Sequence, residues 1–377
     1  MIPVNEPVFG DREAEYTAEC IRTGWVSSAG RFIEEFEQRW AAFCGMKYGV
    51  AVNNGTSALE LAVETLGLKP GDEVIIPSFT IISCALAIVR NGGVPVLVDC
   101  DPVTFGLDAS QVESRITPRT RAIMPVHIYG HPVDIDEILT IAKKHHLVVI
   151  EDAAEVHGAK YHAGRAGASP QWRRCGGLGD ISTFSFYANK LVTTGEGGMA
   201  LTNDAAIAER MRSQRNLCFR PERRFYHTHL GNNFRITNLQ AAVGVAQLER
   251  IDEIVARKRR MGHRYTERLN GIARLQLPVE QAWARAVYWM YAVVLDEAVG
   301  FDALEFARRL KNEGVETRPF FLGMHEQPAL HDLGFFNGER YPITERIARQ
   351  GLYLPSGLAL TDDQIDQVCA AVRRTLA

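Results

Sequence analysis

The sequence lacks the features that mark secreted, membrane-spanning and nucleic-acid-binding proteins. Its 42 lysines and arginines are balanced by 45 aspartates and glutamates, so there is no basic excess to hold a nucleic-acid backbone. The first residues, MIPVNEPVFGDREAEY, carry charges early and contain no apolar core of a signal peptide. The most apolar runs, residues 74–77 and 147–150, are too short to cross a bilayer. We therefore expect a cytoplasmic protein with no nucleic-acid or membrane partner. The balanced total charge does not exclude a local cationic pocket for one small anion.

Cysteines are few and follow no metal-binding or disulfide pattern. The seven of them are scattered, odd in number and without CxxC spacing, which predicts reduced thiols that fill the core or the surface and no metal site. Of the 377 residues, 46% are hydrophobic and 23% are charged, which is the composition of an ordinary globular protein. The length predicts two or three domains, and no repeat, low-complexity tract or flexible linker separates them.

Short apolar runs alternate with helical stretches from about residue 47 to residue 204. Runs of strand length, apolar or rich in β-branched residues, lie at 48–52, 73–77, 94–99, 121–126, 147–151, 181–186 and 198–202. Apolar residues at helical spacing lie at 56–66, 81–90 and 134–145. Continuously apolar strands separated by helices predict an α/β fold whose parallel sheet is covered on both faces.

The pattern changes to long helices after Thr237. We predict that Thr237 is the N-cap of a helical stretch that runs to about residue 269, and we interpret its basic run, residues 257–260, as a solvated helix face. A strand rich in Trp, Tyr and Val (residues 287–295) and helices over 302–313 and 361–376 follow. These elements predict a large α/β domain of residues 1–250, which includes the N-terminal segment, and a small α+β domain of residues 251–377.

An aspartate stands at the carboxyl end of one predicted strand. Asp152 follows the buried run VVIE, and this is the edge at which α/β proteins bind their ligands. Its carboxylate could bind a metal, a ribose or a cationic ring nitrogen, and it could equally cap the next helix. Glu155 follows about one helical turn later.

A lysine ends the aromatic strand ISTFSFYANK. Burial disfavours the ammonium form of Lys190, and a neutral amine is a nucleophile that can form a Schiff base. The glycine-rich TTGEGG that follows allows tight turns and close ligand approach. The simpler alternative is a lysine that extends into solvent from a strand end.

The segment NNGTS from Asn53 lies between a strand and a helix. Backbone N–H groups at that helix start and the hydroxyls of Thr56 and Ser57 predict a phosphate cradle, with an ordinary capped turn as the alternative. The segment matches neither GxGxxG nor GxxxxGK[ST]. A phosphate cradle, a strand-end aspartate and a lysine are together what pyridoxal 5'-phosphate (PLP) requires: a phosphate anchor, a partner for the pyridinium nitrogen and a Schiff-base amine.

Longer motifs around these residues resemble one protein family. Over nearly its whole length the chain is similar to the DegT/DnrJ/EryC1/StrS family of PLP-dependent nucleotide-sugar aminotransferases. The matching segments are GWVSS from Gly24, NNGTSAL from Asn53, GDEVIIPSFT from Gly71, HIYGHPVDID from His127, VIEDAAE from Val149, TFSFYANK before TTGEGG, and NNFRITNLQAA from Asn232. The segments MIPVNEP, ETRPFF from Glu316 and LYLPSGLALTDDQI from Leu352 most resemble members that aminate C4 of GDP-4-keto-6-deoxymannose.

This resemblance implies the aspartate aminotransferase-like architecture, PLP fold type I. That architecture has a mainly parallel seven-stranded sheet between helices, a small C-terminal α+β domain, and a homodimer whose active sites lie at the subunit interface. It implies that Lys190 is the catalytic, PLP-binding lysine, that Asp152 pairs with the pyridinium nitrogen and that Glu155 lies near the ring hydroxyl. The implied phosphate ligands are Thr56, Ser57 and Ser185, and Gly55 and the partner subunit's Asn233 are also implied to bind the cofactor. The implied substrate-binding residues are Trp25, Ser27, Arg235 (entering with Asn233 from the partner subunit) and His325.

The chain departs from the family pattern at three places. Ile81, a cofactor-binding position, stands where the family usually has an aromatic ring over PLP, so a β-branched contact or a different aromatic must substitute. An insertion at residues 168–176, ASPQWRRCG, could contact an anionic substrate or form an exposed loop. LGMH at residues 322–325 replaces the usual aromatic/His-Pro-x-His.

The reaction implied is a transamination in two halves. L-Glutamate would give its amino group to the cofactor, which cycles between PLP and pyridoxamine phosphate, and leave as 2-oxoglutarate. The amino group would then pass to C4 of a nucleotide-linked 4-keto-6-deoxyhexose, for surface polysaccharide or glycoside biosynthesis. The alternatives are a UDP- or dTDP-linked keto-sugar or a cyclitol ketone as substrate, a sugar dehydratase of the same family, which would carry histidine in place of Lys190, a non-catalytic regulatory homologue, and an NAD oxidoreductase.

Overall fold

The centre of the molecule is a seven-stranded sheet. The computed structural model describes residues 1–165, 170–220, 222–223 and 225–377. In spatial order the strands are β1 (Tyr48–Val52), β9 (Gly198–Thr202), β8 (Ile181–Ser185), β5 (Val148–Asp152), β4 (Thr120–Ile123), β2 (Glu73–Pro77) and β3 (Val94–Val98). All neighbouring strands are parallel except β9, which is antiparallel to both β1 and β8. The predicted mainly parallel seven-stranded sheet is therefore confirmed.

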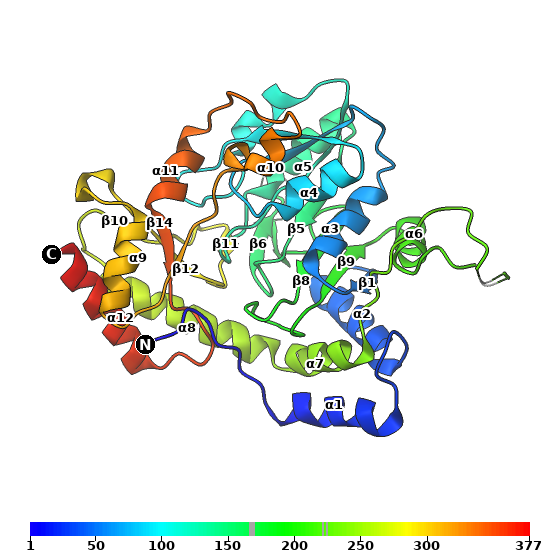
Figure 1. Cartoon of the computed structure of the whole chain (residues 1–377), viewed down its shortest axis with the longest axis horizontal. Helices are drawn as coiled ribbons and strands as arrows, with labels where there is room; N and C mark the ends of the chain where they lie inside the picture. Colours follow the sequence, from blue (N-terminus) through cyan, green and yellow to red (C-terminus); the bar gives the residue numbers. More distant parts are fainter. Residues whose placement is uncertain (166–169, 221, 224) are drawn as a thin grey trace.

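Helices cover both faces of this sheet (Figure 1). In the first two thirds of the chain the helices are α1 (Asp11–Thr23), α2 (Arg31–Cys44), α3 (Gly55–Glu64), α4 (Ser83–Arg90), α5 (Ile135–His145), α6 (Ala205–Arg215) and α7 (Asn238–Glu249), with short 3-10 turns at Ala109–Gln111 and Glu113–Arg115. Helix α1 does not lie on the sheet but packs on the outer side of α7 (Figure 1). Side chains alternate along β8: Phe184 packs edge-on against Trp40 of α2 at 5.1 Å, whereas Ser185 points to the other face, beside Gly55 of α3. Strand β8 thus sends one side chain into the core and the next toward the start of α3.

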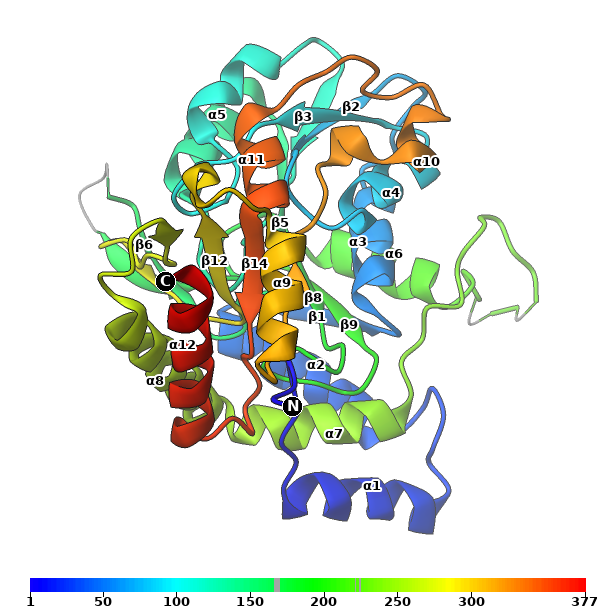
Figure 2. The same cartoon turned by 60° about the vertical axis from the view of Figure 1, so that its left-hand side comes forward.

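The C-terminal third builds a second, smaller layer of helices on a sheet (Figure 2). Its strands, in spatial order, are β10 (Leu275–Gln276), β12 (Tyr291–Leu295), β14 (Gly351–Leu354) and β13 (Arg318–Pro319). Its helices are α8 (Ile251–Leu269), α9 (Ala303–Asn312), α10 (Pro328–His331), α11 (Pro342–Gln350) and α12 (Asp362–Leu376), with 3-10 turns at Glu297–Val299 and Met324–Glu326. Ile2 bridges Val315 and packs in the hydrophobic core of this part. The division of the chain at residue 250 stays a prediction.

Three sequence-based expectations need correction. Thr237 does cap a helix, by accepting the Gln240 N–H, but the helical stretch breaks at Arg250 into α7 and α8. Lys258, expected on a solvated face, is buried. The strand expected over residues 287–295 begins only at Tyr291, because Tyr288 has a left-handed φ of 48°, which no strand residue adopts.

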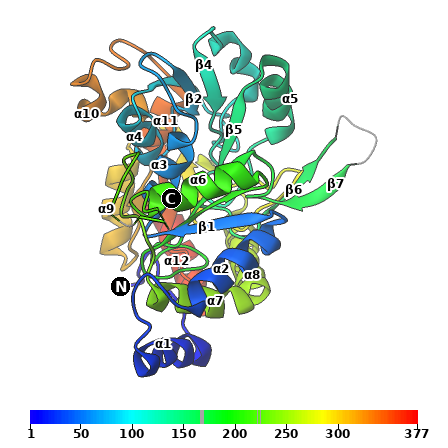
Figure 3. The same ribbon diagram turned by 90° about the vertical axis from the view of Figure 1, so that its right-hand side faces the viewer.

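A third sheet was not expected from the sequence. It joins β11 (Ala284–Arg285), β6 (Lys160–Ala163) and β7 (Gln171–Arg174), and β6 and β7 project from the body of the molecule (Figure 3). An exposed loop over the whole insertion is therefore wrong for residues 171–174, while Ala168 and Ser169 of the insertion lie outside the described residues. Trp172 stacks on His162 at 4.9 Å, so this ring stabilises the β6–β7 pairing.

The cysteines lie in the core, one of the two locations expected for them. All seven are buried and unbonded to one another. Across the described parts of the chain, no helix combines the length and the apolar character that a bilayer crossing would need.

Candidate active site

A cavity of about 310 Å³ opens at the carboxyl ends of β5 and β8 and the start of α3. Seven of the predicted site residues line it: Gly55, Thr56, Ile81, Asp152, Glu155, Ser185 and Lys190. They come from segments far apart in the sequence, and the parallel strands bring them to one edge of the sheet. This is the position at which open α/β sheets bind ligands.

Asp152 ends β5 with its carboxylate at the cavity wall. One oxygen accepts the Ala154 N–H at 3.0 Å, and the other lies 3.5 Å from the Cys84 sulfur. Burial raises the pKa of Asp152, an effect that the Ala154 N–H opposes. A cationic ring nitrogen beside this carboxylate would favour its charged form. The arrangement suits the predicted pairing with a pyridinium.

Lys190 does not extend into solvent. Its side chain is 10% exposed, and its Nζ lies 3.9 Å from Glu155 Oε1 and 3.6 Å from the centroid of the Trp289 ring. Burial lowers the pKa of Lys190, whereas the carboxylates of Glu155 and Asp152 oppose that shift. A larger fraction of this amine is therefore neutral and nucleophilic than in an exposed lysine.

Glu155 is the nearest ionisable partner of this lysine. Its Oε2 accepts the Tyr129 N–H at 2.7 Å, which leaves Oε1 facing Lys190. Burial raises the pKa of Glu155 to about 7, although Lys190 and the Tyr129 N–H act in the opposite direction. Because the pKa of Glu155 is raised and the pKa of Lys190 is lowered, the two groups can share a proton near neutral pH.

The start of α3 forms a tight cradle. Asn54 caps the helix by accepting the Ser57 N–H at 2.8 Å, and the first-turn N–H groups have no partner within the helix. A Cβ on Gly55 would come within 2.6 Å of the Ser185 Cβ, so only glycine allows this approach. The Thr56 hydroxyl lies 2.9 Å from that of Ser83. Ser57 itself is buried and does not line the cavity.

These residues fit PLP. Two buried oxygens of the cavity wall, Thr183 Oγ1 and Asn189 Oδ1, have no hydrogen-bond partner among the described residues, as expected for a wall that faces a polar ligand. Asp152 would hold the ring nitrogen, Lys190 the aldehyde carbon, and Thr56, Ser185 and the first turn of α3 the phosphate. The bound group supplies an electron sink that stabilises negative charge on a carbon attached to its amine nitrogen.

Besides Ser57, four predicted residues from two other segments lie outside this cavity. Arg235 lines a second cavity of about 600 Å³ and donates to Asn216 Oδ1 at 2.9 Å, while Asn233 forms a backbone bridge with Asn216. The carbonyls of Trp25 and Ser27 accept hydrogen bonds from Asn238. These residues form a separate group in one chain, and their predicted contacts with PLP or substrate stay predictions.

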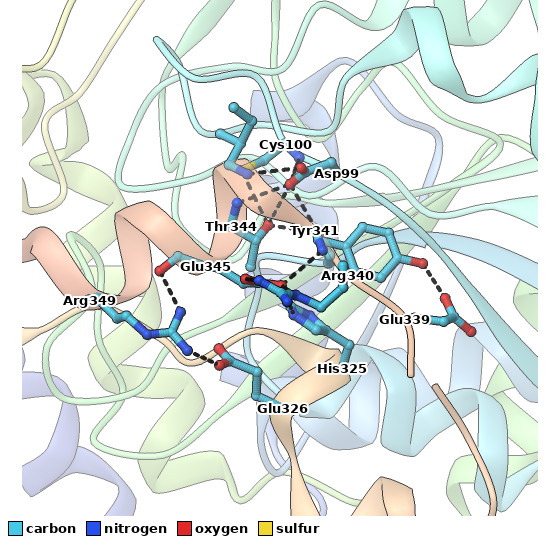
Figure 4. Close-up of polar contacts among 12 residues, drawn as sticks. Asp99, Cys100, His325, Glu326, Glu339, Arg340, Tyr341, Thr344, Glu345 and Arg349 are labelled. Carbon is cyan, nitrogen blue, oxygen red and sulfur yellow. Dashed lines mark hydrogen bonds and ion pairs between the residues drawn. The ribbon is translucent and has the colours of Figure 1, made fainter. Parts of the chain in front are cut away.

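His325 is not brought to the wall of the 310 Å³ cavity either. Figure 4 shows its ring directed at Glu345, with the Glu345 oxygen 3.2 Å from Nε2. Its ring also packs edge-on against Tyr341 at 4.9 Å. The same glutamate forms two 2.6 Å hydrogen bonds to Arg340. His325 is thus held in a buried polar cluster at the start of α11, so its predicted contact with the sugar nucleotide gains no support from this position.

Aromatic residues of the cavity wall were missed by the sequence reasoning. Trp289, Phe321, Tyr353 and Tyr187 line the cavity together with Ile81, which is 45% exposed. They supply the aromatic contact surface that isoleucine lacks. The unusual density of aromatics in AVYWMYAVVL was the available signal, but the pattern was assigned to a strand alone.

The sheet, the buried lysine and the strand-end aspartate define the class of the protein: a PLP-dependent aminotransferase of fold type I. Residues 7–373 match the DegT/DnrJ/EryC1/StrS aminotransferase family, and the chain belongs to this family.

Named relatives and solved structures agree with this assignment. The chain is 45% identical to the GDP-perosamine synthase of Caulobacter vibrioides, covering 100% of this chain and 98% of the relative. It is 38% identical to that of Escherichia coli O157:H7, covering 98% and 97%. Among solved structures, the aminotransferase TlmJ from Streptoalloteichus hindustanus superposes with a TM-score of 0.91 at 32% identity, covering 100% and 99%. DesI, solved in the presence of its TDP-sugar product, superposes with a TM-score of 0.87 at 32% identity, covering 100% of this chain and 92% of the DesI chain.

Proposed function

We propose that this protein transfers the amino group of L-glutamate to C4 of GDP-4-keto-6-deoxymannose, giving GDP-perosamine and 2-oxoglutarate. The observation that carries the proposal is the buried Lys190 amine, which lies between Glu155 and Trp289 at the edge where Asp152 ends β5. The sugar assignment is supported by similarity to two GDP-perosamine synthases along almost the whole chain.

Lys190 performs the proton transfers. Its neutral amine removes the proton from the α-carbon of the donor, and in the second half it delivers a proton to C4 of the sugar. Glu155 takes up or returns the proton of the amine between these events, because the two groups are buried together and 3.9 Å apart. Asp152 keeps the ring nitrogen protonated throughout, and Thr56 and Ser185 anchor the phosphate.

A sugar dehydratase is the nearest alternative within the family. Those enzymes are expected to carry histidine where this chain has Lys190, so that no Schiff base to the protein forms. The lysine at this position supports transamination. A dTDP-linked keto-sugar is the strongest alternative substrate, since DesI was solved with a TDP-sugar product.

The functional unit we propose is a homodimer. Asn233 and Arg235 of one subunit would complete the cavity of the other, because in their own chain they lie outside it. The exposed apolar side chains of Ile21 and Trp25, 67% and 57% exposed, lie in and directly after α1 and would be covered by a second chain.

The substrate is identified by offering several sugars to one enzyme. Protein, PLP and L-glutamate are incubated separately with GDP-, UDP- and dTDP-linked 4-keto-6-deoxysugars, and the products are analysed by mass spectrometry. Amination of the GDP-linked sugar at the highest kcat/KM is expected. The substrate assignment is wrong if that sugar alone stays unchanged, and amination of none of them would contradict the aminotransferase function itself.

A further inference from the structure

The segment before β12 turns its tryptophan away from the small sheet and toward the cavity. Tyr288 has a left-handed backbone, and the Trp289 nitrogen lies so close to Gly130 that a Cβ there would be 2.4 Å away. The Val287 N–H donates to the Gly130 carbonyl at 2.9 Å. This close backbone contact is possible because Gly130 has no side chain and a φ of 99°.

Trp289 contacts the lysine in two ways. Its ring centroid lies 3.6 Å from Lys190 Nζ, and its Nε1–H donates to the Asn189 carbonyl at 2.8 Å. The indole face attracts the ammonium form of the amine, and the hydrogen bond holds the backbone directly before it. One side chain, 4% exposed, thus contacts both the amine of Lys190 and the backbone that precedes this lysine.

The backbone of Trp289 is in turn held by Lys258 of α8. Lys258 is 2% exposed and has no carboxylate partner among the described residues. Its Nζ donates to the Trp289 carbonyl at 2.7 Å and to the carbonyl of Ser356, whose hydroxyl accepts the Tyr291 N–H at 2.8 Å. Burying an amine without a counter-ion is costly. The cost is offset here by two carbonyls that belong to the segments beside Trp289 and after β14.

We propose that Trp289 is a positioning residue for Lys190 and that the Lys258 amine holds Trp289 in place. The proposal rests on the proposed transamination at Lys190. The indole orients Nζ toward the side of Glu155 and stabilises its protonated form, and Lys258 transmits the position of α8 to the active-site lysine through one backbone carbonyl.

Other groups also act on the charge of Lys190. Asp152 faces it from the end of β5, and Glu155 faces it from the loop that follows. His157 lies within electrostatic range of it. Tyr129 and Tyr353 face Glu155. Substitution of Trp289 leaves all five in place, so a change in the ionisation of Lys190 then reports on the indole.

The test measures PLP uptake by the apoenzyme as a function of pH. Uptake requires the neutral amine of Lys190, is followed by the absorbance of the bound cofactor, and needs no sugar. The Trp289→Leu substitution keeps an apolar cover without the π face, and it is expected to move the pH midpoint of the uptake rate down by on the order of one unit. Trp289→Phe keeps an aromatic face, so its pH midpoint is expected to stay close to that of the wild type.

The second arm addresses Lys258. Lys258→Met is expected to lower the midpoint in the same direction by a smaller amount, and Lys258→Arg, which keeps the donors, to restore it. Arg260→Met on the exposed side of α8 is the matched control and should leave the midpoint unchanged. If Lys258→Met does not fold, Lys258→Gln is measured in its place.

The outcomes separate this proposal from the proposed function. An unchanged midpoint in Trp289→Leu, with uptake intact, would show that the indole only packs. A Lys258 variant that loses thermal stability while its midpoint stays at the wild-type value would reduce Lys258 to a structural role. Wild-type enzyme that takes up PLP and aminates no sugar would instead contradict the proposed function. The pH midpoints of PLP uptake could still be compared in that case, because uptake needs no sugar.

Discussion

At the scale of single residues, the chemistry depends on one buried pair. Lys190 and Glu155 are both removed from water, and each favours the charged form of the other. Burial acts against both charges, which is why the pKa of Glu155 rises to about 7 and the pKa of Lys190 falls. The pair is therefore set to exchange a proton near neutral pH, where the reaction needs the amine in both forms.

Glu155→Gln tests this pair. The amide keeps the shape and can still accept the Tyr129 N–H, but it cannot take up a proton. We expect kcat to fall by about 10²-fold, the lower end of the usual effect of general acid–base catalysis, and the rise of the rate around pH 7 to disappear. The pH–rate profile of the variant is compared with that of Glu137→Gln, an exposed site on α5. A variant that keeps the wild-type rise would show that another group titrates there.

At the scale of secondary-structure elements, the approach of α3 to β8 builds the phosphate end of the site. Asn54 caps α3, and Gly55 lets its first turn lie directly against Ser185. NNGTS predicted this cradle because glycine after an N-cap residue is a local signal. The close contact with Ser185 could not be predicted, since it depends on which face of β8 meets α3.

Gly55→Ala should separate these elements. The added Cβ would lie 2.6 Å from the Ser185 Cβ, so α3 or β8 must shift, at a cost of about 1–3 kcal/mol in the free energy of unfolding. We expect a clear loss of PLP affinity, measured by titrating the apoenzyme with PLP. Gly92→Ala, at a turn with open space around it, has the strain of a positive φ without a clash and is the control. Equal PLP affinity in both variants would contradict the cradle.

Helix α8 carries a residue, Lys258, whose contribution to the free energy of unfolding depends on pH. Burial lowers the pKa of Lys258 to about 7, well below that of an unfolded lysine. Between pH 7 and the pKa of lysine in the unfolded chain, the unfolded chain binds more protons than the folded one. The stability supplied by this site therefore rises with pH across that window. The difference in unfolding free energy between wild type and Lys258→Met, from urea denaturation, should therefore grow from about pH 7 to pH 9. A difference, wild type minus variant, that stays constant over this range would mean that Lys258 stays charged when buried.

At the scale of the whole molecule, local pattern predicted the large sheet well and the remainder less well. The seven strands of the sheet are runs of apolar or β-branched residues, and each expected run overlaps the observed strand. The β6–β7–β11 sheet was missed because its strands are short and polar, as in QWRR. The burial of Lys258 and the turn at Tyr288 depend on contacts between distant segments, which no local pattern records.

The same limit applies to the candidate site. Asp152, Glu155, Lys190 and the start of α3 were predictable because each carries its own chemical signature. Trp289 and Phe321 were not, since a buried aromatic residue looks the same in a core as in a cavity wall. Arg235 and Asn233 lie outside the cavity of their own chain, and the role proposed for them depends on a second subunit.

That dependence can be tested by mixing subunits. Lys190→Ala and Arg235→Ala homodimers should each be nearly inactive, since one lacks the amine and the other the arginine supplied across the interface. Co-expression with two different tags and isolation of the mixed dimer should restore one intact site. A mixed dimer as inactive as either parent would contradict shared active sites.

The most direct test of the account follows the transferred nitrogen. Wild-type enzyme and the Lys190→Ala variant are each supplied with PLP, GDP-4-keto-6-deoxymannose and L-glutamate labelled with heavy nitrogen, and the sugar product is analysed by mass spectrometry. The account predicts labelled GDP-perosamine with wild type and none with the variant. An unlabelled or absent amino sugar with wild type, or steady turnover by Lys190→Ala, would contradict it.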